Sequence, residues 1–525
     1  MTLCYLKKSG SESEIVRIGV SVCAPFWESE QLRSHAPASW SQRRNRSAPG
    51  CAVLLSSGDR WRATGNVIVA AKCDRPPSGL PGPYDVSSFG CYRPAMTEQR
   101  DMHTKMKLET TPDVWADGGP VDDWTTDYDI RDKDYVENPV PIWAEMRDKC
   151  PVAHTDRLGG SWNPTTFDDV REMAKMTTEL SSRQMLVMPP APGAPEMSRY
   201  EQMIVAAPIS ADPPIHTWTR RMLLPAFAPK AVTAFEPYTE ELAHSLIDGF
   251  IESGRCDGAE HYAQQIPPRV IAHMIGVDEG MANQFVEWVK GVLGDGLLDP
   301  ELRLKVRAEL LGFIGAEVEK RMKDPQDDLL TELLFMELDH PEAKITPEVV
   351  VGVTNLLIVA GIDTTWSSIG SALWHLATNP ADRERLVNEP ELLPIAVEEF
   401  LRYYAPVTMA RIAEVDVEYN DDVHIKRGDK ILMNFPAACH DPAQFENPDE
   451  FIIDRARNRH IAFGSGIHRC AGSNLARLEM TVALRVWLER IPEFSLREGE
   501  EMAWAGGQVR GPRVMPFEFP AGSKR

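Results

Sequence analysis

Residues 463–472 read Phe-Gly-Ser-Gly-Ile-His-Arg-Cys-Ala-Gly, and this stretch contains the densest chemical signal in the sequence. Its glycines allow the backbone to turn tightly and to approach a flat group closely. Cys470 stands just before a helix expected over residues 472–490, where backbone N–H groups and the helix dipole favour a thiolate. A thiolate in a glycine-lined turn is a suitable axial ligand for haem iron. For an isolated cysteine, a buried structural thiol would be the simpler interpretation.

The ten-residue pattern resembles the cysteine loop of the cytochrome P-450 family of haem-thiolate monooxygenases. The match comprises Phe463, Gly464, His468, Cys470 and two further glycines. The resemblance implies a mainly α fold with a smaller β region, the triangular haem-thiolate fold of that family. It also implies heme b (iron protoporphyrin IX) as the cofactor, with Cys470 as the ligand of the metal.

A second signal lies in the apolar segment predicted as one helix over residues 347–378, where an acid and two hydroxyl groups follow Gly361. Such polar groups are costly in a buried helix unless they are satisfied, and a helix kink explains them as well as a functional site does. Asp363 and Thr364 resemble the acid–alcohol pair of the same family. The resemblance implies that both relay protons during dioxygen activation, with Asp363 linked to solvent and Gly361 beside the cofactor.

Glu399 and Arg402 lie at positions i and i+3 of a predicted helix, so their side chains can meet on one face. A surface ion pair is the ordinary explanation for this spacing. The two residues nevertheless resemble the structural Glu–Arg pair of the family, and Arg455 matches its third member. The resemblance implies a buried triad, in which the loss of one charge would be strongly destabilising.

His216 and Arg220 are four residues apart and share one face if they are helical. Two donors on one face suit a carboxylate partner, although an exposed amphipathic helix gives the same pattern. The pair resembles the family's His-x-x-x-Arg helix, which binds a haem propionate. Arg411 and His468 match the other propionate partners by the same resemblance.

The net charge of −22 disfavours a generic nucleic-acid binder, because phosphate binding needs a basic surface. We find no apolar run of the roughly 18 residues that a membrane-spanning helix needs, and no secretory signal. None of the nine cysteines forms a C-x-x-C motif, which argues against a zinc ribbon, an iron–sulfur cluster or a redox pair. We therefore expect a soluble cytoplasmic protein with no membrane or nucleic-acid partner. The resemblance to the cytochrome P-450 family implies its soluble, bacterial type, because the anchor helix and proline-rich hinge of the microsomal members are not seen in the sequence.

The composition changes near residue 100. Residues 1–100 are net basic and contain five of the nine cysteines, whereas the rest of the chain is strongly acidic. We interpret residues 1–105 as an extension outside the main fold, either disordered or foreign to the natural product. Residues 106–525 are interpreted as one haem-thiolate monooxygenase domain.

Apolar periodicity predicts helices over residues 231–253, 279–296, 300–323, 347–378, 391–404 and 472–490, and strands over 411–417, 422–426 and 430–435. Thr346-Pro347 is typical of a helix start, with Thr as the N-cap and Pro as the first helical residue. A short strand is expected at 162–166. Residues 184–209 are expected to form a long loop.

The substrate pocket is predicted from the same resemblance to include Val359, Ala360, Val407, Thr408 and Met188. Apolar and adaptable side chains of this kind suggest an apolar small organic substrate, and no charged anchor for a substrate carboxylate stands out. Reductase motifs are missing from the sequence. Dioxygen and a separate ferredoxin-type electron donor with its reductase are therefore the expected partners.

Two other functions remain open. A haem-thiolate peroxygenase or peroxide isomerase would need no electron donor, and a non-enzymatic haem sensor would need no catalytic residues. The Asp363–Thr364 pair favours the monooxygenase, because a peroxide-driven enzyme does not need such a proton relay.

Overall fold

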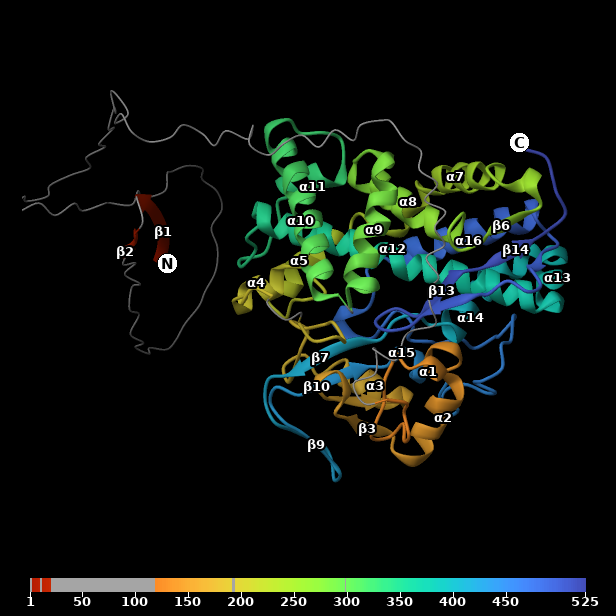
Figure 1. The fold of residues 1–525 in the computed structure, drawn as a ribbon, viewed down its shortest axis with the longest axis horizontal. Helices are drawn as coiled ribbons and strands as arrows, with labels where there is room; N and C mark the ends of the chain where they lie inside the picture. The colour runs from red at the N-terminus through yellow and green to blue at the C-terminus, as the bar shows by residue number, and fades with distance from the viewer. Residues whose placement is uncertain (1, 10–11, 20–118, 191–193, 298) are drawn as a thin grey trace, which may run out of the picture. The chain divides into compact units, whose positions relative to one another are not determined.

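The computed structural model describes residues 2–9, 12–19, 119–190, 194–297 and 299–525 (Figure 1). The chain divides into two units, residues 1–98 and 99–525. In the first unit, strands β1 (Thr2–Ser9) and β2 (Glu12–Gly19) pair as an antiparallel hairpin. The other residues of the predicted extension 1–105 lie outside the described residues, so the division at residue 105 stays a prediction.

The second unit is mainly helical, as the periodicity predicted. Its α-helices are α1 (Lys133–Glu137), α2 (Val140–Lys149), α3 (Phe167–Met173), α4 (Arg199–Ile204), α5 (Ile215–Leu223), α6 (Pro229–Thr233), α7 (Glu236–Asp248), α8 (Ile266–Ile275), α9 (Ala282–Leu293), α10 (Pro300–Lys323), α11 (Leu329–Phe335), α12 (Pro347–Thr378), α13 (Pro380–Asn388), α14 (Leu393–Tyr403), α15 (Phe435–Ala438) and α16 (Ser473–Arg490). Short 3₁₀ turns connect several of them.

The strands form small sheets. They are β3 (Val152–Thr155), β4 (Ser161–Pro164), β5 (Leu180–Ser181), β6 (Arg255–Asp257), β7 (Met409–Ala413), β8 (Val417–Asn420), β9 (Val423–Ile425), β10 (Lys430–Met433), β11 (Ser495–Leu496), β12 (Ala503–Ala505), β13 (Gly511–Val514) and β14 (Pro516–Glu518). The five-stranded sheet has the order β3-β4-β10-β7-β5, and β4 pairs parallel to β10. This sheet lies with α1, α2 and α3 in one half of the unit, and α7 to α12 gather with α16 in the other half (Figure 1).

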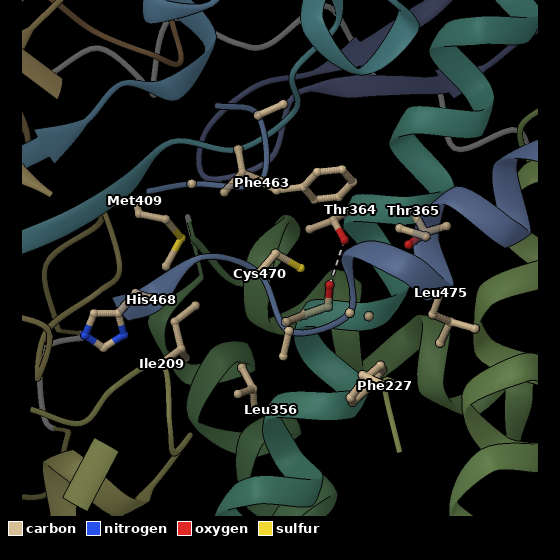
Figure 2. Close-up of a pocket in the computed structure, with 18 of the residues that line it drawn as sticks. Ile209, Phe227, Leu356, Thr364, Thr365, Met409, Phe463, His468, Cys470 and Leu475 are labelled. Carbon is tan, nitrogen blue, oxygen red and sulfur yellow. Dashed lines mark hydrogen bonds between the residues drawn. The ribbon is translucent and has the colours of Figure 1, made fainter. Parts of the chain in front are cut away.

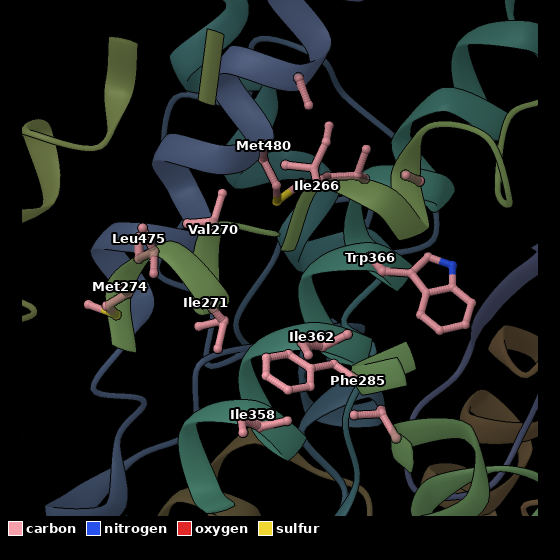
Figure 3. Packing of buried hydrophobic residues seen from close by; sticks show 14 of the residues in the cluster. Ile266, Val270, Ile271, Met274, Phe285, Ile358, Ile362, Trp366, Leu475 and Met480 are labelled. Carbon is pink, nitrogen blue, oxygen red and sulfur yellow. The ribbon is translucent and has the colours of Figure 1, made fainter. Parts of the chain in front are cut away.

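Helix α12 runs through the helical half, and its start is capped as predicted, because the Thr346 hydroxyl accepts a hydrogen bond from the Val349 N–H. Ile358 and Ile362 of α12 pack in one cluster with Ile271 of α8 and Met480 of α16 (Figure 3). Burying these side chains stabilises the contact between α12 and α16. The loop before α16 is thereby positioned against α12.

Helix α12 is long and apolar enough to cross a membrane by length and composition, with a mean hydropathy of 1.6 in its most apolar window. The expectation that no apolar stretch reaches spanning length is therefore wrong for this helix. Its few polar residues interrupt the apolar run, but they lower the mean hydropathy of the window too little to exclude a spanning helix. Of that window, 61% is buried in the structure, which is the pattern of a core helix packed between other helices.

The predicted helices over 300–323 and 347–378 are confirmed with the same bounds, as α10 and α12. The segment 231–253 is instead divided into α6 and α7, because a proline near the start of α7 cannot continue a preceding helix. The predicted loop 184–209 contains α4, which begins with a capping box formed by Ser198 and Glu201. Sequence periodicity missed α8, because eight of its ten residues are buried and no polar face marks the period.

Candidate functional site

A large cavity lies between α12, the loop 463–472 and the start of α16 (Figure 2). Its empty space is about 1410 Å³, including the part that is open to solvent. Its lining is mostly apolar and includes Ile209, Phe227, Ile271, Leu356, Ala360, Val407, Met409, Phe463 and Leu475.

The tight turn of the loop 463–472 depends on two glycines and on backbone hydrogen bonds within the loop. Gly464 and Gly466 have φ angles of +76° and +71°, a conformation that strains residues with a side chain. The Cys470 N–H donates to the Phe463 carbonyl at 2.7 Å. Phe463, Gly464, His468 and Cys470 all line the cavity (Figure 2).

Cys470 is a free thiol whose sulfur is accessible because it faces the cavity. Its position deep within the protein raises the pKa of the thiol. The Gly472 N–H and the positive charges of Arg220, Arg469 and Arg477 act in the opposite direction and favour the thiolate. The site thus combines a desolvated sulfur with surrounding groups that stabilise its charged form.

Helix α12 presents one face to the cavity, and this face includes Gly361, Thr364 and Thr365. The Thr364 hydroxyl donates to the Ala360 carbonyl at 2.7 Å, as a threonine in a helix often does. Figure 2 shows Thr364 and Cys470 among the side chains that line the cavity. The helix therefore brings a hydroxyl group to the same cavity as the thiol.

Asp363 lies on another face of α12 and is not part of the cavity lining. It is 4% exposed, so the expected link to solvent is not found. Its Oδ1 lies 2.8 Å from Nη2 of Arg513 and accepts a hydrogen bond from the Ser367 hydroxyl at 3.2 Å. Burial raises the pKa of the Asp363 carboxyl, and Arg513 and Ser367 offset this only in part.

A cationic wall, formed by the guanidinium groups of Arg220 and Arg411 with the ring of His468 beside them, lines one part of the cavity. Burial and the nearby arginines lower the pKa of His468 well below its usual range, which favours its neutral form. His468 Nε2 lies 2.9 Å from the Ser182 hydroxyl, and its ring packs against the ring of His216 with centroids 4.4 Å apart. His216 lies behind this wall, outside the lining, with Nε2 3.1 Å from the Ile467 carbonyl.

These cations have no internal counter-ion. Among the residues that the structure describes, no carboxylate oxygen comes within 4.0 Å of the guanidinium nitrogens of Arg220 or Arg411. Burial lowers the pKa of Arg411 to about 10, and burial together with Arg220 lowers that of His216 to about 4. A buried cation without a counter-ion is unfavourable, so the wall suits an anionic group bound in the cavity.

Glu399, Arg402 and Arg455 form a buried ion-pair cluster away from the cavity. Arg402 donates from Nε and Nη2 to the two Glu399 oxygens at 2.8 Å each, and Arg455 Nε lies 3.0 Å from both. Arg402 also donates to the carbonyls of Cys439 and Pro448. The structure thus brings the three predicted residues together, and their hydrogen bonds connect α14 to the segment that follows α15.

A family model described as Cytochrome P450 matches residues 301–501. The 6-deoxyerythronolide B hydroxylase of Saccharopolyspora erythraea is 32% identical over 410 residues, which cover 76% of this chain and 96% of that relative. This chain belongs to the cytochrome P450 family. The vitamin D(3) 25-hydroxylase of Pseudonocardia autotrophica is also 32% identical to this cytochrome P450, over 400 residues that cover 75% of the chain and 96% of the relative.

Solved cytochrome P450 structures share the fold. CYP109E1 from Bacillus megaterium, solved in complex with testosterone, is 30% identical with a TM-score of 0.66, and the match covers 73% of this chain and 98% of that structure. The fold inferred from the cysteine loop is therefore confirmed. Like the hydroxylases named above, this cytochrome P450 is a monooxygenase that oxidises an organic small molecule with dioxygen.

Cytochromes P450 use haem, and the residues of this cavity fit that group. Cys470 presents its sulfur to the cavity, and a thiolate is the axial ligand that haem monooxygenases require. Arg220 and Arg411 supply cations without a counter-ion, which suit the two carboxylates of the cofactor.

The predicted substrate residues divide into two groups. Ala360 and Val407 line the cavity of this cytochrome P450, whereas Val359, Thr408 and Met188 do not. Val359 is one residue from Ala360 and so lies about 100° around the helix. Thr408 alternates with Val407 and Met409 in an extended segment, so its side chain points to the opposite side. Met188 is buried in a separate apolar cluster.

Two polar residues of this cytochrome P450 were missed by sequence reasoning. Glu479 of α16 lines the cavity, is 1% exposed and has an Oε2 without a hydrogen-bond partner among the described residues. Burial raises its pKa well above the usual range. Its position between Leu475 and Val482 on one helical face was an available signal. Arg513 gave no local signal, because its partner Asp363 is distant in sequence.

Pro208 and Ile209 line one side of the cavity and end a covering segment, of which the structure describes residues 185–190 and 194–209. It is fastened to α12, since Asn355 Nδ2 donates to the Val205 carbonyl at 2.9 Å. At Gly352 the two approach so closely that an added Cβ would lie 1.8 Å from the Ile204 carbonyl oxygen.

Proposed function

We propose that this cytochrome P450 is a cytoplasmic monooxygenase that binds heme b through Cys470 and hydroxylates, or otherwise oxidises, an apolar small molecule. Electrons would come from a separate ferredoxin and its reductase. The observation that carries the proposal is that Cys470 and Thr364 line one cavity, whose remaining lining is mostly apolar. An oxygen-activating centre needs such a thiolate and a proton donor close to an apolar substrate.

In this proposal the cationic wall holds the haem propionates. Arg220, Arg411 and His468 face the cavity directly, while His216 orients His468 from behind. Phe463 and Gly464 lie at the start of the cysteine loop and border the same space. When bound, the haem supplies the iron at which dioxygen is reduced.

Thr364 and Asp363 would supply protons to the cavity. The Thr364 hydroxyl already faces it and can exchange its bond to the Ala360 carbonyl for one to a bound group. Asp363 can take part only after its carboxylate leaves Arg513 and turns toward the cavity, or through a water chain. The proposed roles are therefore unequal, with Thr364 acting directly and Asp363 replenishing its proton.

The proposed substrate is apolar because the cavity lining includes the apolar side chains of Ile209, Leu356, Val407 and Met409. Met409 adds an adaptable side chain to this surface. The relatives are named as hydroxylases of 6-deoxyerythronolide B and of vitamin D(3), and CYP109E1 was solved with testosterone. This diversity supports a broad apolar class rather than one compound.

The electron donor would dock beside Cys470. Arg469 is exposed beside the cysteine and offers a positive charge to an acidic ferredoxin. Arg477 is less suited to this role, because its guanidinium is paired with Glu398 and packs over Phe463.

The carbon monoxide difference spectrum of the dithionite-reduced protein tests the thiolate assignment. We expect a strongly red-shifted Soret band in the wild type and its loss in Cys470→Ala. Cys150→Ser is the matched control, since Cys150 is a free thiol outside the cavity lining, and it should retain the band. Retention of the band in Cys470→Ala would overturn the assignment.

A turnover experiment separates the monooxygenase from the peroxide-driven alternative. The holoenzyme is supplied either with a reduced ferredoxin and dioxygen or with hydrogen peroxide alone. We expect product mainly with ferredoxin and dioxygen. Efficient turnover with peroxide, and none with the reduced donor, would favour the peroxygenase.

We further propose that residues 106–525 form the catalytic domain. Deletion of residues 1–101 should therefore leave haem content and the carbon monoxide spectrum unchanged. Loss of haem in the truncated protein would show that the N-terminal segment belongs to the functional fold.

A further inference from the structure

Arg477 of α16 lies over the aromatic ring that begins the cysteine loop. Its guanidinium carbon is 4.5 Å from the centre of the Phe463 ring, which is the geometry of a cation–π contact. The Phe463 carbonyl accepts the hydrogen bond from the Cys470 N–H, and both residues line the cavity (Figure 2). Arg477 therefore contacts the residue to which the backbone of the cysteine is bonded.

The charge of Arg477 is paired with that of Glu398 in α14. Arg477 Nη2 donates to Glu398 Oε2 at 2.8 Å, and its Nε donates to the other carboxylate oxygen, so the contact is bidentate. Nη1 of the same arginine donates to the Ser473 carbonyl at 3.2 Å, in the first turn of α16. Two helices thus hold the guanidinium in one place.

His460 completes this cluster without adding a charge. Its Nε2 lies 3.1 Å from Glu398 Oε2, and its Nδ1 accepts a hydrogen bond from the Ala462 N–H at 3.3 Å. A ring nitrogen that accepts carries no hydrogen, so this geometry fits the neutral ring that donates from Nε2. Among the described residues, Arg477 is the one Lys or Arg that pairs with Glu398. The cluster therefore contains one cation and one anion, each compensated by the other.

We propose that the Arg477–Glu398 pair sets the electrostatic potential at the Cys470 sulfur, and with it the reduction potential of the bound haem. The inference rests on the proposed function, because the pair can act on the iron only if Cys470 is its ligand. Reduction adds negative charge beside a thiolate, so a nearby cation favours it and a nearby anion opposes it. Neither residue lines the cavity, so both are positioning residues that act through the cysteine loop.

Spectroelectrochemical titration of the holoenzyme at pH 7 tests the inference. Arg477→Gln leaves the charge of Glu398 uncompensated and should shift the reduction potential of the haem to a more negative value. Glu398→Gln leaves the charge of Arg477 uncompensated and should shift the potential to a more positive value. The double variant removes both charges, and its potential should lie between those of the single variants. Arg477→Lys keeps the charge and should remain closer to the wild type than Arg477→Gln.

Arg485→Gln is the matched control. Arg485 lies on the same helix and donates to both carboxylate oxygens of Glu240 in α7, and its side chain is 31% exposed, against 30% for Arg477. Eight residues separate the two arginines, which places Arg485 about 12 Å farther along the helix from the cysteine loop. This variant should keep the wild-type potential, because it removes an ion pair from α16 without changing the charge near Cys470.

The inference is overturned if neither single variant shifts the potential. It is also overturned if both shift it in the same direction, since a loosened cysteine loop would affect both alike, or if Arg485→Gln shifts it as far as Arg477→Gln. If Arg477→Gln does not retain haem, the comparison of Glu398→Gln with the wild type decides, and an unchanged or more negative potential overturns the inference.

The carbon monoxide spectrum keeps this failure distinct from failure of the proposed function. A red-shifted band in the wild type, together with unshifted potentials in the variants, rejects the role of the charge pair alone. Absence of that band in the wild type rejects the thiolate centre itself.

Discussion

Arg513 of β13 and Asp363 of α12 form an ion pair, with 2.8 Å between Nη2 and Oδ1, on the side of the helix that faces away from the cavity. The Arg513 guanidinium also lies 4.4 Å from the centre of the Trp366 ring and donates to the Ser367 hydroxyl. The C-terminal strand thereby holds the acid of the predicted acid–alcohol pair in a defined orientation.

The substitution Arg513→Gln should lower the free energy of unfolding by about 3–5 kcal/mol, because it leaves a buried carboxylate without its partner. Urea denaturation at pH 7 measures this loss. The double variant Arg513→Gln, Asp363→Asn removes both charges and should regain much of the stability. An unchanged unfolding midpoint in the single variant would contradict the ion pair.

Thr364→Ala should keep the haem and the substrate while diverting electrons to hydrogen peroxide. Product formed per electron should fall steeply, since a proton-transferring group typically contributes about 10²–10⁴-fold to the rate of the step it serves. Thr365→Ala is the control, since Thr365 lines the cavity on the same helix without an assigned role. The ratio of product to hydrogen peroxide measures this effect. If Thr364→Ala still directs most of its electrons into product, Thr364 has no part in the proposed relay.

Glu398 should contribute stability that depends on pH. Burial alone would raise its pKa, but Arg477 and His460 outweigh this and lower it to about 2. The ionised form therefore stabilises the fold above the ordinary pKa of about 4.3, and this contribution is lost as the pH falls toward 2.

Glu398→Gln should accordingly cost about 2–3 kcal/mol at pH 7, after allowance for its partial exposure. The difference from the wild type should disappear between pH 4 and pH 2 in urea titrations at several pH values. Glu384→Gln, at an exposed position without an ion pair, should change stability little at any pH. A constant difference across that pH range would contradict the low pKa.

Glu479 should have the opposite dependence on pH. Burial raises its pKa, so the folded protein keeps this group protonated where the unfolded chain has already ionised it. Its contribution therefore becomes increasingly unfavourable as the pH rises above the ordinary value of about 4.3. Glu479→Gln should match the wild type near pH 4 and be more stable at pH 8. Equal stability at both values, measured by urea denaturation, would show that the carboxyl group is satisfied.

Local sequence predicted the features that depend on neighbouring residues. The turn at Gly464 and the start of α12 at Thr346 follow from conformational preferences and capping within a few positions. The face shared by Glu399 and Arg402 follows from helical spacing. The cysteine loop then identified the family, and with it the order of the helices.

Features that depend on contacts between distant segments could not be predicted in this way. The partner of Asp363 is a strand residue 150 positions later, and no local pattern relates the two. The side on which Val359 or Thr408 points depends on the exact rotation of one helix and one extended segment. That no described residue bonds to Oε2 of Glu479 becomes visible only when all neighbouring elements are placed.

Gly352 limits how the enzyme can acquire new substrates. The covering segment approaches α12 there with no room for a side chain, since an added Cβ would lie 1.8 Å from the Ile204 carbonyl. Any larger residue would lift that segment and loosen the bond between Asn355 and Val205. Evolution or laboratory selection toward bulkier compounds is therefore easier through substitutions at Ile209, Leu356 or Met409. These substitutions change the lining of the cavity while the covering segment keeps its contact with α12.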